Sequence, residues 1–274
     1  MGTSATSTGP GANVTFDPPW LNDIPLGGAG ESNDPNSDTQ SITQAQAVGV
    51  APSHRFRGAR TNLGVFARNG DSRALVRAAG HYSRTGMGGA HNVASRMRTS
   101  TKAAAGLGSF LQAARDRSDP LINQWMDSLR ATNPSAQTVI DAIVAQIIPE
   151  GGSVDEESAK DSMAQALSEL TVLDPGVDLL ALQDMQIWTL IQLYLGHEAC
   201  NRMYADIGQL FENAKFDPAV IVQRTHEMRS FLKNAVAAEL ETLRLVTPNP
   251  NRQQLETLLR EAVQTTFIVF EDSI

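Results

Sequence analysis

Cysteine, aromatic residues and long apolar runs are all scarce in this chain of 274 residues. The single cysteine, Cys200, has no second cysteine with which to form a disulfide, which is typical of a protein from a reducing compartment. No apolar run approaches the roughly 20 residues that cross a bilayer, and the N-terminus lacks the pattern of a secretory signal. Aromatics make up only 5% of the chain, which favours helices packed through Leu, Ala, Val and Met. We therefore expect a cytoplasmic protein with no membrane contact.

Sequence motifs for catalysis or metal binding are also missing. His197-Glu198 and His226-Glu227 each form a His-Glu pair, but neither is followed by the second histidine of an HExxH zinc site. Neither a GxSxG nor an SxxK nucleophile motif is present. Cys200 falls in an apolar helical pattern, where a core position is expected. The sequence predicts a non-enzymatic protein that holds no cofactor and no metal of its own.

Charge is distributed very unevenly along the chain, whose net charge is -8. Residues 1–53 contain five acids and no Lys or Arg, whereas residues 54–117 contain 12 Lys and Arg against two Asp. Residues 118–274 are acidic again, with 10 basic and 23 acidic residues. Three parts are predicted: a disordered tail (1–53), a basic, partly helical docking segment (54–117) and an acidic helical domain (118–274).

The tail is rich in Gly, Ser, Thr, Pro and Asn, yet two features distinguish it from a plain linker. Residues 17–26, DPPWLNDIPL, place Trp20 and Leu21 in a short apolar motif that is either a sticky disordered stretch or a peptide that docks in a groove. Gly2 follows the initiator Met, whose removal would expose a flexible amine. The same start fits the N-myristoylation pattern, with Thr6 in its last position. A plain tail, an acylated tail and another use of the Gly2 amine all remain open.

From Ser72 onward, helical periodicity and capping residues predict an all-α multi-helix bundle behind the tail. The first helix is interrupted by SRTGMGGAHN, and Asp-Pro or Asn-Pro steps punctuate the later ones. Leu121, Ile122, Trp125 and Leu129 are expected to face the core, and the final TTFIVF to be partly extended. The expected helices cover residues 72–82, 88–117, 121–131, 135–148, 155–173, 179 or 183 to 213, 218–245 and 252–270.

Two features of the basic segment have more than one interpretation. Gly86, Gly88 and Gly89 form either a phosphate-binding turn at a helix start or a close-packed turn between helices. They lack the preceding strand and the spacing of a dinucleotide fingerprint. The arginines indicate either contact with nucleic acid or pairing with acidic groups of this chain or of a partner protein.

Four strings in this chain resemble the QatB family, a component of the bacterial Qat anti-phage defence system. They are MGTS at the start, PPWLND, FRGARTNLGVFAR and HYSRTGMGGAHNVASRM, in that order. The resemblance is sharp across residues 1–110 and diffuse over the helical remainder, where DMQ at 184–186 is similar to the family.

The resemblance implies partners more than it implies a mechanism. Qat systems look like a set of four proteins: an ATPase, the QatB-family subunit, a QueC-like enzyme and a TatD-like nuclease. In related defence systems, QueC-like enzymes are associated with attaching a deazaguanine-type group to the N-terminal glycine of a partner protein. By that analogy Gly2 is the modification candidate, and the tail is the part that the QueC-like enzyme binds.

Two functions follow as alternatives. One is a non-enzymatic subunit whose tail is bound and covalently modified by the QueC-like enzyme, and the other is an adaptor that directs the nuclease to phage DNA through its arginines. The candidate docking residues are Trp20, Leu21, Arg55, Phe56, Arg57, Arg60, Phe66, His81, Tyr82, Arg84, Gly88, Gly89 and His91.

Overall fold

The computed structural model describes residues 54–148, 153–212, 216–247 and 250–274, and it has helices and no strand in these ranges. The predicted all-α multi-helix bundle is therefore confirmed. The predicted disordered tail, with Gly2, Trp20 and Leu21, lies outside the described residues. The elements are α1 (Arg57–Asn69), α2 (Ser72–His81), the π-helix η2 (Tyr82–Met87), α3 (Ala90–Arg96), α4 (Arg98–Asp116), α5 (Pro120–Ala131), α6 (Ala136–Ile147), α7 (Val154–Leu173), α8 (Asp184–Ile207), the 3-10 helix η3 (Gly208–Glu212), α9 (Pro218–Val246) and α10 (Arg252–Glu271).

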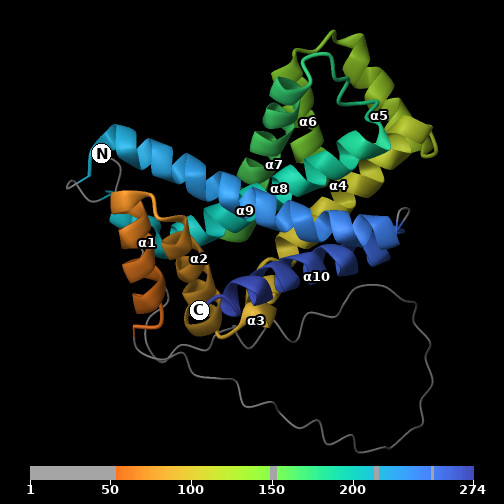
Figure 1. Ribbon diagram of the computed structural model, residues 1–274. Coiled ribbons are helices and arrows are strands. Elements are labelled where there is room, and N and C mark those ends of the chain that lie inside the picture. The colour runs from red at the N-terminus through yellow and green to blue at the C-terminus, as the bar shows by residue number, and fades with distance from the viewer. Residues whose placement is uncertain (1–53, 149–152, 213–215, 248–249) are drawn as a thin grey trace, which may run out of the picture.

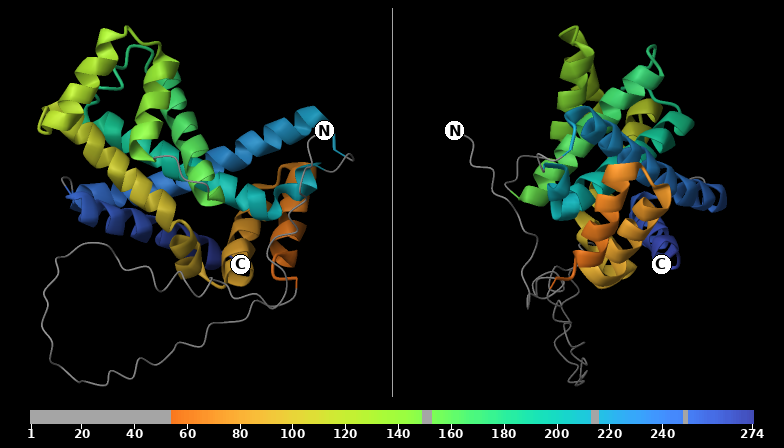
Figure 2. Two further views of the ribbon diagram at one scale, coloured as in Figure 1. Left: turned by 180° about the vertical axis from the view of Figure 1, so that it is seen from behind. Right: turned by 60° about the vertical axis from the view of Figure 1, so that its left-hand side comes forward.

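The long helices α8, α9 and α10 form the centre of the bundle (Figures 1 and 2). α8 packs against α7 on one side and α9 on the other, and α10 packs against α9, α4, α3 and α2. The α1–α2 hairpin lies at one end of the bundle, while α5 and α6 lie at the opposite end, where they pack on α4 and α7. The last helix of the chain thus closes over helices from its first third.

Local capping explains where most helices begin. Asp119 accepts hydrogen bonds from the backbone amides of Leu121 and Ile122 and is followed by proline at the first helical position. Ser153 and Glu156 form a capping box at the start of α7. Because such caps involve residues three apart in sequence, the predicted starts of α5, α7 and α9 agree with the structure to within a few residues.

Four details differ from the prediction. α1 was not predicted, because Gly58, Gly64 and several polar residues obscure its apolar stripe. The predicted helix 88–117 is broken at Met97 into α3 and α4. Residues 265–270 are helical rather than partly extended, since α10 continues to Glu271.

The fourth difference concerns the start of α5. Leu121 was expected in the core, but its side chain is 77% exposed, whereas Ile122, Trp125 and Leu129 pack against the core. None of the described helices combines the length and apolarity needed to cross a membrane.

Two glycines allow helices to approach closely. A β-carbon at Gly80 of α2 would lie 2.4 Å from the carbonyl oxygen of Phe270 in α10. A β-carbon at Gly196 of α8 would lie 2.7 Å from the Cα of Lys233 in α9. A larger residue at Gly80 would push α2 away from α10, and one at Gly196 would push α8 away from α9.

Candidate functional site

The segment that follows the tail is fixed to the bundle by buried residues. Arg55 and Phe56 are 6% and 4% exposed, and the Phe56 ring stacks on Tyr82 of η2 with a centroid separation of 5.8 Å. The Tyr82 hydroxyl donates to Asp206 Oδ2 at 2.9 Å, and Arg60 Nη2 donates to the Asp206 carbonyl oxygen at 3.0 Å. Asp206, near the end of α8, therefore ties α1 and η2 to the centre of the bundle.

The pKa shifts at this junction indicate that Tyr82 and Arg55 have a structural role and do not transfer protons. Burial and the neighbouring carboxylate of Asp206 raise the pKa of Tyr82 well above its ordinary value, so its hydroxyl stays a hydrogen-bond donor. Burial lowers the pKa of Arg55, although the Asp206 carboxylate acts against this. The Arg55 guanidinium lies 4.9 Å from the centroid of the Phe56 ring, at cation–π distance.

The interruption predicted at SRTGMGGAHN is a six-residue π-helix, η2, followed by a glycine turn. A β-carbon at Gly86 would lie 2.5 Å from the Phe56 ring, so Gly86 is closely packed. Gly88 and Gly89 have φ of +80° and +116°, which L side chains rarely adopt. A β-carbon at Gly89 would meet nothing within 4 Å, so the packing interpretation holds for Gly86 and not for Gly89.

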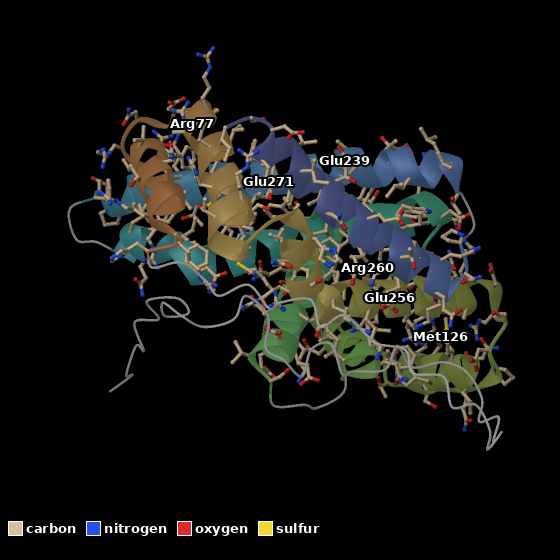
Figure 3. The ribbon with its side chains drawn as sticks, turned by 90° about the horizontal axis from the view of Figure 1, so that it is seen from below. Arg77, Met126, Glu239, Glu256, Arg260 and Glu271 are labelled. Carbon is tan, nitrogen blue, oxygen red and sulfur yellow. The ribbon has the colours of Figure 1, made fainter. Side chains whose placement is uncertain are left out.

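η2 is also connected to the end of α10. The buried Ser83 hydroxyl donates to Glu271 Oε1 at 2.5 Å. Glu271 lies where α10 meets the first helices, whereas Met126 of α5 lies at the opposite end of the bundle (Figure 3). π-Helical segments are rare and frequently occur at functional sites. η2 is therefore a candidate functional element beside the junction.

The structure divides the predicted docking residues into two groups. Four of them are buried beneath the surface: Arg55, Phe56, Phe66 and Tyr82. Gly89, Arg60 and His81 are half-buried, and the His81 ring would be 2.9 Å from a β-carbon at Gly58. The exposed members are Arg57, Arg84, Gly88 and His91.

Phe66 lies apart from the others, at the far end of α1. The Arg224 guanidinium of α9 lies 5.9 Å from the centroid of its ring. Phe66, Leu75 and Phe231 line a groove of about 560 Å³ between the α1–α2 turn and α9. Sequence reasoning did not identify this groove, because α9 contributes half of it from more than 150 residues away.

Part of the basic segment pairs internally. Arg115 pairs with Asp116 and Asp184, and Arg117 with Asp127. The pairs with Asp184 and Asp127 join this segment to acidic residues of 118–274. Several other bases are exposed, with no acidic group of the described residues within salt-bridge distance. These are Arg57, Arg68, Arg73, Arg84 and Lys102.

A buried carboxylate between α4, α7 and α8 is the largest polar feature that the sequence did not reveal. Glu198 is fully buried and accepts hydrogen bonds from Ser100 at 2.9 Å, Ser158 at 3.0 Å and Ser162 at 2.7 Å. Arg202 Nε donates to it at 2.7 Å. Its donors come from three helices, so only the Glu198–Arg202 spacing was visible in the sequence.

The outer end of this network reaches the surface. Arg202 also pairs with Asp155 at 2.7 Å. Burial opposes the charge on Arg202, yet the carboxylates of Glu198 and Asp155 raise its pKa above the ordinary value. The network is therefore a structural ion pair, in which the buried Nη2 of Arg202 has no hydrogen-bond partner among the described residues.

A second polar cluster joins α7, α8 and α9. His197 Nε2 lies 2.7 Å from Glu169 Oε2, and Lys233 Nζ donates to Glu169 Oε1 at 2.5 Å. Burial lowers the pKa of His197, so its ring is neutral at pH 7. Cys200 is buried as expected, and burial raises the pKa of its thiol to about 11. Across the described ranges, three or more His, Cys, Asp or Glu do not gather into a potential metal site.

Comparison with known proteins identifies a family. The family model described as "Qat anti-phage system associated protein QatB" matches residues 88–270, about two thirds of the chain. The matched range runs from the glycine turn to the end of α10, and it leaves out the tail, α1 and α2. No curated protein and no solved structure matches.

Proposed function

Since the chain belongs to the QatB family and is thus a component of the Qat anti-phage system, we propose that it is a non-enzymatic subunit whose N-terminal tail is a substrate. In this proposal a QueC-like partner enzyme binds the tail and covalently attaches a deazaguanine-type group at Gly2. The ATPase and the TatD-like nuclease of the same system are the other proposed partners.

The composition of the tail is the observation that carries this proposal. Residues 1–53 contain no lysine, so after removal of Met1 the α-amino group of Gly2 is the only primary amine in the tail. An α-amino group has a pKa of about 7.7–8.0, against about 10.4 for lysine, so a much larger fraction is uncharged and nucleophilic at neutral pH. A modifying enzyme that binds the tail therefore meets a single reactive amine.

The junction with the bundle supports the same function. Arg55 and Phe56 are buried directly after the tail, so the tail leaves the folded body at a fixed point. The exposed Arg57 lies beside that point, and Arg84 lies on η2, which packs against α1. A partner with an acidic surface could bind this face while its active site receives the tail.

Mass spectrometry of the N-terminus tests the proposal. The protein is expressed with and without the QueC-like enzyme, and with an enzyme variant lacking activity. We expect an added mass on the Gly2 peptide only with the active enzyme. Inserting Pro after Met1 should abolish the added mass, whereas the matched change Gly11→Pro should leave it in place.

Two outcomes would contradict the proposal in different ways. An unmodified Gly2 peptide in the presence of active enzyme would refute tail modification. An added mass on the peptide of Gly9 or Gly11 would show that the tail is processed before it is modified, and would refute the choice of Gly2.

The exposed, unpaired bases support a second candidate, an adaptor that binds nucleic acid. Arg57, Arg73 and Arg84 are suited to phosphate contacts, whereas Arg55 and Arg60 have partners within the protein. If this function holds, affinity for DNA falls steeply with salt, and each of Arg57→Ala, Arg73→Ala and Arg84→Ala reduces the slope of log affinity against log salt by about 1. Absent or salt-independent binding would rule it out.

A further inference from the structure

We propose that residues 17–26 of this chain dock, within the same molecule, in the groove between the α1–α2 turn and α9. The groove and the peptide motif were identified independently, one from the structure and one from the sequence. The proposal goes beyond the modification of Gly2 and does not depend on it.

The groove is suited to an aromatic and an aliphatic side chain. Phe66, Leu75 and Phe231 form its apolar floor, and its volume of about 560 Å³ lies in the range of pockets that hold small ligands. Phe66 is only 2% exposed, so half-buried Phe231 provides the accessible ring, and rings prefer to pack against other rings in stacked or edge-to-face arrangements. Trp20 and Leu21 are adjacent large apolar residues in the tail. Tryptophan is enriched among the residues that contribute most of the binding energy at interfaces.

The polar edge of the groove is suited to an acidic peptide. Asp17 and Asp23 flank the apolar motif, which contains no basic residue. Arg68 and Arg73 are exposed on either side of the α1–α2 turn, and neither has an acidic partner among the described residues. Arg224 also lines the groove, where it pairs with Glu227 at 2.6 Å. Neither Arg68 nor Arg73 lines the groove itself, but both place positive charge beside it, and Asp71 between them pairs with Arg77.

Chain length places the motif within reach of this groove. The tail joins the bundle at His54, and the groove lies at the other end of α1, a helix of 13 residues. At 1.5 Å per residue the separation is about 20 Å. Residues 27–53 are mostly small and polar, and a random coil of their length has a root-mean-square length of about 30 Å. A linker slightly longer than the span gives an effective concentration in the millimolar range, so even a weak peptide contact is occupied.

Two other grooves among the described residues fit this peptide less well. The groove between α6 and α7 is lined by Asp141, Glu157 and Asp161 against only Lys160, so it would repel an acidic peptide. The groove between the end of α9 and the start of α10 contains Glu261 and no basic residue. It also lies at the end of the bundle opposite to the α1–α2 hairpin (Figure 1). Of these three grooves, the one beside α1 combines an accessible aromatic ring, nearby basic residues and proximity to the tail.

Distance measurements between spin labels test the proposal in the full chain. Asn22→Cys places one label in the motif, and Val222→Cys places the other on the exposed face of α9 next to the groove. Cys200 need not be removed, because it is buried and its thiol pKa is raised to about 11. The protein is purified without partners, so the result is independent of whether Gly2 is modified.

We expect a narrow, short distance distribution in the unsubstituted tail. Without docking, we expect a broad distribution, because a random coil of the length that joins position 22 to His54 has a root-mean-square length of about 30 Å. Trp20→Ala removes the anchor and should lower the docking equilibrium constant roughly 30-fold, converting the narrow peak to the broad one. The substitution lies in the tail, so the helical circular dichroism signal should not change.

Two further variants, each with a control variant, test the groove itself. Ser230→Trp adds bulk to an exposed groove position and should displace the motif, whereas Ser168→Trp, on the exposed face of α7, should not. Arg73→Glu should weaken docking and Lys102→Glu should not, since Lys102 lies on α4 away from the groove.

Two results would overturn the proposal. The first is the same broad distribution with and without Trp20. The second is a narrow distance that appears only between singly labelled chains after mixing, because the occupant would then be the tail of a second copy.

Discussion

Replacing Glu198 by alanine removes the carboxylate to which α4, α7 and α8 are all bound. Ser100, Ser158 and Ser162 each lose their buried acceptor, and Arg202 keeps only Asp155 as an ion-pair partner. Removing one partner of a buried ion pair typically costs 3–5 kcal/mol, much of it from the charge that is left behind. We therefore expect Glu198→Ala to lower the free energy of unfolding by about 3–5 kcal/mol, a large fraction of the stability of an ordinary domain.

Urea denaturation followed by far-UV circular dichroism measures this loss. With an m-value of about 2–3 kcal/mol per molar urea, the midpoint should fall by roughly 1–2 M. Glu241→Ala is a matched control, because Glu241 also pairs with an arginine on its own helix, yet its side chain is 44% exposed. Exposed pairs are worth less than about 1 kcal/mol, so this control should shift the midpoint little.

The double variant Glu198→Ala/Arg202→Met gives a further check. If the cost arises from the uncompensated guanidinium, the double variant should be less destabilised than the sum of the two single variants. Equal, small shifts for Glu198→Ala and Glu241→Ala would refute the description of Glu198 as the buried centre of this network.

Three other predictions follow from the packing and the titratable groups. Gly80→Ala should lower the unfolding free energy by about 1–3 kcal/mol, because its β-carbon would meet the Phe270 carbonyl oxygen. A shift below the measurement error would contradict the close α2–α10 contact. Gly64→Ala, in a helix interior where the nearest atom is the flexible end of Arg68 at 3.7 Å, should raise it by up to about 1 kcal/mol, and a loss of stability there would refute the existence of α1. The folded-state pKa of His197 is lowered by burial, beside Glu169, Lys233 and Arg229, so the unfolded chain binds more protons and stability is lost as pH falls below about 6.5. Between pH 7.5 and 5.5, the urea midpoint should fall with pH in the wild type and in His226→Gln, and less steeply in His197→Gln. Equal slopes in all three proteins would contradict the assignment of this pH dependence to His197.

The features that could be predicted from the sequence are those decided by neighbouring residues. Asp119-Pro120 and Asp217-Pro218 start helices through their own side chains, so α5 and α9 were predicted correctly. α1 was missed although Ala59, Leu63, Phe66 and Ala67 follow helical spacing, because the glycines and arginines between them favour a loop when propensity is considered alone. Its stability comes from packing against α2 and α9, which no local pattern contains.

The candidate site was predictable to a similar extent. The arginines and the glycine turn are visible in the sequence, but which of them are accessible depends on tertiary contacts. Phe56 and Tyr82 were expected at a docking surface, and the structure instead stacks them in the interior. The groove lined by Phe66 and Phe231, and the serines around Glu198, unite residues far apart in the chain. Only the folded structure brings them together.

The position of α10 has a consequence for synthesis of the protein. This helix packs on α2, α3, α4 and α9, so the apolar faces of the early helices have no cover until the last helix has been made. At about 5–20 residues per second, translation takes roughly 10–45 s to pass from the end of the tail to the end of α10. The tail has therefore left the ribosome well before the bundle can close. A modifying enzyme that requires only the tail can act on the nascent chain, whereas one that also requires the docking face must wait for α10.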